Sequence, residues 1–195
     1  MMKMKRSQWI AVLGACLLAA CASQTPTASR VEQVTAQDGS QRVTALPARL
    51  ICEQPRCPAL SAQWSSQRAG VVVLTIGLPY QTARVTGADF HFGASQVVRL
   101  RVPSDARPPA LADNEPRTSF DVPLSLIDAL AYKPDGWVRV STEDGRAVNE
   151  LVRTGERTSD VVDTMRDFLR LVDAASGKPA DARTGGNNGL FDLLK

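Results

Sequence analysis

The alternation of apolar and polar residues predicts that most of the chain forms short antiparallel strands. Residues 71–78, Val-Val-Val-Leu-Thr-Ile-Gly-Leu, are almost continuously apolar and β-branched. Such a run is typical of a central strand that is buried on both faces. Shorter strands are predicted, in chain order, at Val31–Ala36, Gln41–Leu46, Ala59–Ser65, Ser119–Val122, Trp137–Thr142 and Arg146–Arg153.

A hairpin is predicted from Ala88 onward. Residues 88–92 alternate with a period of two, which directs Phe90 and Phe92 to the core and Asp89 and His91 to the opposite face. A turn containing glycine then leads into a second half-buried strand, whose core-facing residues are Val98, Leu100 and Val102.

Two further hairpins are predicted where Asp38-Gly39 and Asp144-Gly145 interrupt alternating runs, because Asp-Gly pairs favour the tight turns that join antiparallel strands. In the later hairpin, Trp137 and Arg139 share one face, while Val138 and Val140 share the other.

Two helices are predicted, at Pro123–Ala131 and Ser159–Ala175. Ser159 or Thr158 is expected to cap the longer helix. Three residues of the first helix are expected to face the core, namely Leu126, Ile127 and Leu130. The longer helix has an apolar stripe made of Val161, Met165, Phe168, Leu169 and Val172.

These elements predict a mainly β protein with α-helices (α+β). The expected architecture is an antiparallel β-sandwich or a strongly curved sheet, with a short helix and a C-terminal helix packed on it. The globular domain is expected to span residues 31–175. Residues 176–195 are rich in glycine and asparagine and are predicted to form a disordered tail.

The first 20 residues have the pattern of a secretory signal peptide. Basic residues precede an apolar run, Trp9–Ala22, of about 14 residues. As a helix this run is roughly 21 Å long, against a bilayer core of ~30 Å. It is therefore too short to span a membrane, and residues 1–20 are predicted to be removed on export.

The apolar run ends in Leu18-Ala19-Ala20-Cys21, which resembles the lipobox of bacterial lipoproteins. The resemblance implies that Cys21 carries a thioether-linked diacylglycerol and that its amino group, freed by cleavage, receives a fatty acid such as palmitate. Ala22 favours the outer membrane, because an Asp there would resemble an inner-membrane retention signal. Residues 21–30 are then a tether. The alternative is an ordinary cleaved signal in which Cys21 has no role.

Loss of the signal changes the charge balance. Three of the 23 basic residues, Lys3, Lys5 and Arg6, lie in the signal, while all 20 acidic residues follow it. The remaining chain has 20 basic and 20 acidic residues, so its net charge is zero. The basic character of the precursor therefore does not indicate a nucleic-acid partner.

Cys52 and Cys57 are the two cysteines of the domain. Their spacing, with a proline between them, predicts a disulfide that closes a small turn. A zinc site would need further ligands, and His91 is the only histidine. A redox centre usually has two residues between its cysteines and a helix after them. Here four residues separate Cys52 from Cys57, and no helical pattern follows, so a redox role is disfavoured.

Two segments are candidate binding surfaces. Residues 103–117 form a proline-rich stretch without apolar periodicity, and long loops are often functional. The alternative is a solvated crossover. The end of the tail carries four apolar residues that could dock on a partner, or could simply fray. The candidate binding residues are Arg107, Pro108, Pro109, Leu190, Phe191, Leu193 and Leu194.

Catalytic motifs are weak. His91 would have to serve any Ser-His-Asp or Cys-His arrangement, and it shares a face with Asp89. No Gly-x-Ser-x-Gly elbow is present. A pair of carboxylates cannot be recognised from sequence, because their separation depends on the fold.

The sequence therefore predicts a lipid-anchored lipoprotein on the periplasmic side of the outer membrane. It would act as a non-catalytic binding or accessory protein of the cell envelope, with another envelope protein as its partner and without a cofactor, a metal or nucleic acid. The alternatives are a small envelope hydrolase that uses Asp89 and His91 or a pair of carboxylates, and a structural subunit of an envelope complex.

Overall fold

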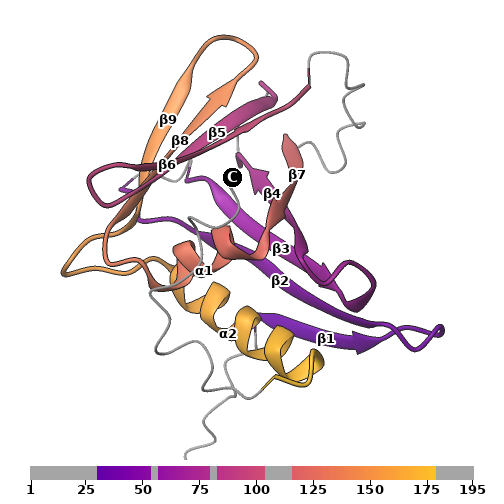
Figure 1. Ribbon diagram of the computed structural model, residues 1–195. Coiled ribbons are helices and arrows are strands. Elements are labelled where there is room, and N and C mark those ends of the chain that lie inside the picture. The colour runs from indigo at the N-terminus through magenta and orange to yellow at the C-terminus, as the bar shows by residue number, and fades with distance from the viewer. Residues whose placement is uncertain (1–29, 54–56, 80–82, 104–115, 179–195) are drawn as a thin grey trace, which may run out of the picture.

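Apolar residues at every second position organise the chain into two antiparallel sheets. The protein is described by a computed structural model that covers residues 30–53, 57–79, 83–103 and 116–178. The candidate residues Arg107, Pro108, Pro109, Leu190, Phe191, Leu193 and Leu194, together with Cys21 and its lipobox, lie outside these ranges. Figure 1 shows the two sheets spreading apart above a pair of helices.

The first sheet has five strands in the order β1-β2-β3-β4-β7. Their bounds are β1 Val31–Thr35, β2 Gln41–Arg49, β3 Ala59–Ser65, β4 Val71–Gly77 and β7 Arg117–Pro123. A short 3-10 helix, Ser66–Arg68, connects β3 to β4. The predicted hairpin at Asp38-Gly39 is confirmed, with Gly39 at φ 80° in the turn between β1 and β2. The strand predicted at Ser119–Val122 is β7, which lies at the edge of this sheet.

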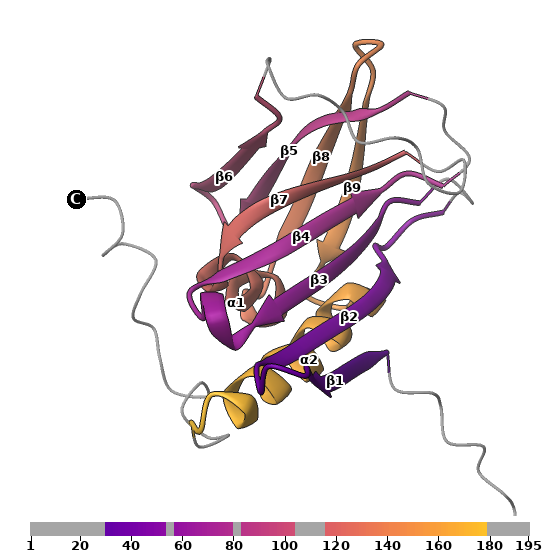
Figure 2. The same cartoon turned by 90° about the vertical axis from the view of Figure 1, so that its right-hand side faces the viewer.

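The second sheet has four strands in the order β6-β5-β8-β9 (Figure 2). Their bounds are β5 Val85–Phe92, β6 Gln96–Arg101, β8 Gly136–Thr142 and β9 Ala147–Arg153. Both predicted hairpins are confirmed, β5 with β6 and β8 with β9. The pairing of β5 with β8 joins the two hairpins into one sheet.

The core lies between the inner faces of the sheets and the helices. Phe90 and Phe92 are buried there, as the alternation predicts. The prediction that β4 is buried on both faces is wrong: Val72, Leu74 and Ile76 are fully buried, while alternate residues remain partly exposed. The helices cover other parts of the core, so no second layer from the described residues covers the outer face of β4.

Helix α1, Leu124–Tyr132, follows β7 directly and buries Leu126, Ile127 and Leu130 as predicted. Its C-terminal carbonyl groups are bound by arginines from other elements. Arg153 of β9 donates from Nη2 to the Ala131 oxygen at 2.9 Å and from Nη1 to the Lys133 oxygen at 3.0 Å. Arg166 donates from Nε to the same Ala131 oxygen at 3.1 Å. These cations also complement the negative end of the helix dipole.

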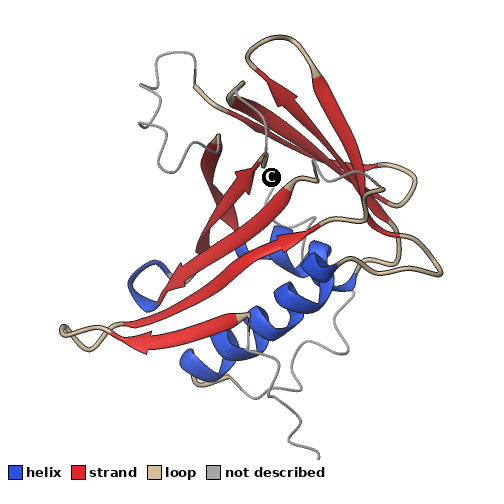
Figure 3. Ribbon diagram, turned by 180° about the vertical axis from the view of Figure 1, so that it is seen from behind, coloured by secondary structure: helices blue, strands red, loops and turns tan. Residues whose placement is uncertain are grey.

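Helix α2, Asp160–Ala175, runs along β1 and β2 of the first sheet and also packs on α1 (Figure 3). All five residues of the predicted apolar stripe are buried. Each such side chain contributes roughly 1.5–3 kcal/mol of hydrophobic stabilisation, so the stripe fixes the position of the helix. The predicted side-chain cap is not formed, because the buried Ser159 hydroxyl has no hydrogen-bond partner.

The end of α2 extends the ordered domain slightly beyond the predicted Ala175. Gly177 has φ 69°, its N–H donates to Ala174 at 3.2 Å, and the Lys178 N–H donates to Asp173 at 2.9 Å. This pattern is a Schellman cap, which satisfies the last carbonyls of a helix. The predicted α+β class with two antiparallel sheets and a packed C-terminal helix is therefore confirmed.

Candidate functional site

The outer face of the second sheet carries a row of apolar and aromatic side chains that crosses all four strands. The strand register places Val97 beside His91, His91 beside Trp137, and Trp137 beside Leu151. We call these four residues the aromatic row. With strands about 4.8 Å apart, the row is about 14 Å long. Val97, Trp137 and Leu151 are 37%, 37% and 42% exposed.

The centre of the aromatic row is a stacked pair of rings. The imidazole of His91 and the indole of Trp137 have centroids 3.7 Å apart and planes within 7° of parallel. The two residues lie on neighbouring strands, so the ring planes face each other and stand upright on the sheet. The stack therefore holds Trp137 in a fixed orientation, while part of the side chain remains exposed to solvent.

A second row, two residues further along each strand, is polar. Its members are Arg99, Asp89, Arg139 and Asn149, and we call it the arginine row. Two residues of an extended strand span about 7 Å, so the two rows lie within reach of one binding partner.

Asp89 forms no ion pair with the arginines beside it, because a third arginine binds its carboxylate. Arg101 Nη1 donates to Asp89 Oδ1 at 2.5 Å and to the Leu100 oxygen at 2.8 Å. This hydrogen bond to Arg101 is the main cause that lowers the pKa of Asp89, and in turn it raises the pKa of Arg101. Arg99 and Arg139 form no ion pair with any residue in the described ranges.

Gly87 makes the contact between Arg101 and Asp89 possible. It is paired with Arg101 across the strands, at a point where the register between β5 and β8 shifts. A Cβ atom on Gly87 would lie 2.6 Å from the Leu100 oxygen and 3.0 Å from Cδ of Arg101. The absence of a side chain therefore lets Arg101 fold across the sheet toward Asp89.

The structure confirms that Asp89 and His91 share the outer face, but it does not join them as a catalytic pair. The hydrogen bond of the Asp89 carboxylate goes to Arg101, and no hydrogen bond links it to His91 among the residues that the structure describes. His91 instead stacks on Trp137. This arrangement gives the imidazole no orienting carboxylate of the kind that a Ser-His-Asp arrangement requires.

A pair of acidic side chains that sequence could not reveal lies near the disulfide turn. Burial is the main cause that raises the pKa of Glu150 on β9, and the charge of Glu53 raises it further.

The neighbouring Cys52 and Cys57 form the predicted disulfide, with Cα atoms 5.6 Å apart and Cys57 buried. Within the described residues, no group of three His, Cys, Asp or Glu side chains could hold a metal ion.

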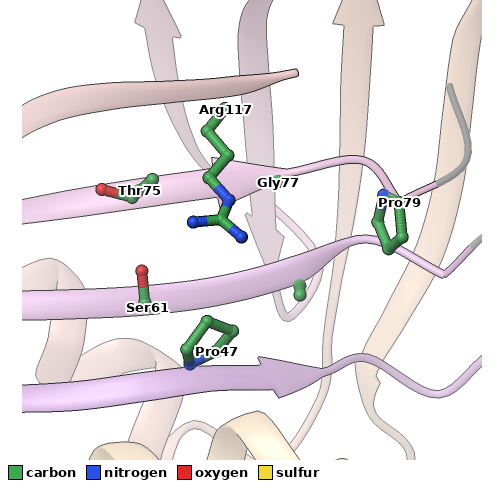
Figure 4. A pocket seen from close by; sticks show the side chains of 7 residues that line it. Pro47, Ser61, Thr75, Gly77, Pro79 and Arg117 are labelled. Carbon is green, nitrogen blue, oxygen red and sulfur yellow. The ribbon is translucent and has the colours of Figure 1, made fainter. Parts of the chain in front are cut away.

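The outer face of the first sheet has a shallow hollow of about 220 Å³ (Figure 4). Thr75, Ser61 and Pro47 lie toward one end of it, Pro79 lies at the other, and Arg117 extends between them. Thr75 Oγ1 already shares a hydrogen bond of 2.8 Å with Ser119. The hollow is open to solvent, and Arg117 is the one charged residue among its described lining residues.

Sequence reasoning found parts of the outer face but not the assembled surface. Trp137 and Arg139 were correctly placed on one face, and so were Asp89 and His91. These residues lie beside Val97, Arg99 and Leu151 only because β5 pairs with β8. The alternation within each hairpin does not predict that pairing.

In comparisons with known proteins, no family model, no curated protein and no solved structure matches the chain. None of the helices in the described ranges combines the length and the apolar character that a membrane crossing needs.

Proposed function

We propose that this chain is a lipid-anchored accessory protein of the cell envelope that binds another protein through the outer face of its second sheet. The observation that carries the proposal is the aromatic row. Among the described residues, six large apolar side chains are exposed, and Val97, Trp137 and Leu151 are three of them. Exposed apolar residues that gather in one place indicate an interaction site, whereas single scattered ones need no explanation.

The composition of the surface fits a protein partner. Tryptophan and arginine are the residues that most often dominate the binding energy of protein interfaces. Trp137 lies at the centre of the aromatic row, and Arg99 and Arg139 lie in the next row. Because the stack with His91 already fixes the indole, less conformational entropy is lost when a partner binds it.

The anchor rests on the lipobox resemblance at Cys21. Arg30, at the end of the predicted tether, forms an ion pair of 2.8 Å with Asp160 at the start of α2. The nine residues from Ala22 to Arg30 span at most ~30 Å. A lipid on Cys21 would therefore keep the binding surface close to the outer membrane on its periplasmic side, where the partner is expected.

The proposal is tested by chemical crosslinking in intact cells that produce the full chain, with the complexes compared between variants. Trp137→Ala and Leu151→Ala are expected to remove the main crosslinked complex. Leu46→Ala is the matched control, because Leu46 lies in the first sheet and is 40% exposed, close to the 42% of Leu151.

Mass spectrometry of the N-terminal peptide is carried out on the same samples. The expected result is an acylated Cys21 in every variant, and an unmodified Cys21 would refute the anchor. A complex that persists in both Trp137→Ala and Leu151→Ala would refute the binding surface.

A further inference from the structure

We infer that the partner contacts this surface with an acidic polypeptide segment, whose apolar side chains lie over the aromatic row and whose carboxylates meet Arg99 and Arg139. This inference rests on the proposed function, since it specifies the chemistry of the partner for the same face. It follows from the distribution of charge around the aromatic row.

The face has an excess of positive charge. Its three arginines, Arg99, Arg101 and Arg139, are opposed by the single carboxylate of Asp89. Arg101 donates a hydrogen bond to that carboxylate and another to the backbone oxygen of Leu100 in β6. Arg99 and Arg139 belong to the strands on either side of β5, and both side chains are exposed.

These two arginines form no ion pair within the described residues, and the one carboxylate that acts on Arg99, that of Asp89, is bound by Arg101. They therefore favour a partner that supplies carboxylates. Arginine binds carboxylates with paired, geometrically specific hydrogen bonds. Complementary charge at an interface speeds association and selects against partners of the same sign. A basic segment would have to place its charges beside Arg99 and Arg139, which is unfavourable.

The Arg101–Asp89 contact contributes to this selectivity. If Arg101 did not bind Asp89, the carboxylate would be available to accept hydrogen bonds from Arg99 or Arg139, between which it lies in the register. By binding Asp89, Arg101 leaves the two flanking guanidinium groups available. Arg101 therefore acts as a positioning residue, and Gly87 provides the space that its side chain needs.

The geometry also limits how the segment can lie. The aromatic row crosses the strands over about 14 Å, and the arginine row runs parallel to it about 7 Å away. A segment that follows the rows would have apolar side chains along one edge and acidic side chains along the other. This pattern is what the experiment looks for in the partner.

The test uses the full-length chain in intact cells, with a photoreactive amino acid in place of Val97 and, separately, of Leu151. The crosslinked peptide is identified by mass spectrometry. The expected result is one segment of another protein that contains apolar residues and at least two acidic residues without compensating basic ones. A basic or uncharged segment, a second copy of this chain, the chain's own residues 190–194, or the absence of a crosslink would each overturn the inference.

The same crosslink is then measured in Arg99→Gln with Arg139→Gln, and in Arg42→Gln as the control. Arg42 is an exposed arginine on β2 of the first sheet. The double variant is expected to lower the yield roughly tenfold, which corresponds to about 1.4 kcal/mol of binding free energy, because two exposed ion pairs with the partner are lost. The control is expected to leave the yield unchanged. An equal yield in the double variant and the wild type would contradict the inference.

The two proposals fail in different ways. If Trp137→Ala removes the complex but the arginine variants do not, the binding surface stands and the acidic partner is wrong. If Trp137→Ala leaves the complex intact, the surface itself is wrong.

Discussion

The indole of Trp137 and the imidazole of His91 lie face to face on neighbouring strands, with 3.7 Å between their centroids. Aromatic pairs of this kind add about 0.5–1.5 kcal/mol beyond the area that they bury. Here the pair is at the surface, with Trp137 37% exposed. Its main effect is therefore to orient the side chain that a partner would contact, and its contribution to folding is small.

Removal of this stack is expected to affect binding far more than stability. Trp137→Ala should lower the free energy of unfolding by about 1 kcal/mol or less, since the ring is not part of the core. Urea unfolding of the purified domain measures this value. Trp64 is the internal comparison, because it is 1% exposed and its indole donates to the Ala69 oxygen at 2.9 Å. Trp64→Ala should cost about 3–5 kcal/mol.

Gly87 should tolerate no side chain. In Gly87→Ala, a Cβ would lie 2.6 Å from the Leu100 carbonyl oxygen, so the β5–β6 pairing has to shift. We expect a loss of about 1–3 kcal/mol in the free energy of unfolding, measured by urea denaturation. Gly155→Ala is the control, because nothing lies within 4 Å of a Cβ there. Equal stability of the two variants would show that β6 adapts without strain.

The Asp89–Arg101 contact predicts that the free energy of unfolding depends on pH in the acidic range. The contact lowers the pKa of Asp89 from its ordinary value of 3.8. A carboxylate with a depressed folded-state pKa adds stability above its unfolded pKa, and this stability is lost as the pH falls through the folded value. The difference in unfolding free energy between wild type and Asp89→Asn should therefore be present at pH 6 and vanish at low pH.

The size of this effect is limited by solvent, because the Arg101 side chain is 53% exposed. We expect about 1 kcal/mol or less. If the difference in unfolding free energy between wild type and Asp89→Asn grew as the pH falls, the lowered pKa of Asp89 would be contradicted. Arg101→Gln should reproduce the effect of Asp89→Asn, while the double variant should add little to either single change.

Arg153 should be important for stability although it lies at a strand end. It donates two hydrogen bonds to the C-terminal carbonyls of α1 and is partly buried. Arg153→Ala would leave those carbonyls with fewer donors, for which we expect a loss of about 1–3 kcal/mol. Arg170→Ala is the matched control, since its ion pair with Asp167 is exposed and should contribute about 0.5 kcal/mol or less. Thermal unfolding of both variants makes the comparison.

Removal of the disulfide is expected to lower the free energy of unfolding moderately. Cys52 and Cys57 close a loop with a sequence separation of five. The chain-entropy argument gives roughly 2 kcal/mol for so short a loop. Replacing both residues with alanine should lower stability by that amount and leave the domain folded. In the native protein, alkylation without reduction should modify neither residue, and labelling of both would mean that the bond does not form.

Local patterns predicted the fold better than they predicted the surface. The stripe from Val161 to Val172 and the alternation around Phe90 correctly identified which faces are buried. The run from Val71 to Leu78 was misleading, because β-branched residues favour any strand and do not reveal whether a second layer covers it. Ser159 was a suitable cap by residue type, but its hydroxyl is buried without a partner.

The proposed binding surface was beyond sequence reasoning for a topological reason. The aromatic row combines residues from two hairpins, and Trp137 lies 46 positions after His91 in the chain. Their contact exists because β5 pairs with β8 in one particular register. A shift of one residue would turn Trp137 and Arg139 to the core, and the alternation within each hairpin is the same in either case.

Protection of the outer face of the second sheet inside the envelope is the most direct test of this account. Single cysteines are placed at Asn149, an exposed residue of β9 beside Arg139 in the second sheet, and at Gln63, an exposed residue of β3 in the first sheet. A membrane-impermeant maleimide then measures their reactivity in the purified protein and in isolated envelopes. The account predicts that both cysteines react in the purified protein, and that in envelopes Asn149→Cys is protected while Gln63→Cys still reacts. Full reactivity of Asn149→Cys in envelopes would contradict it.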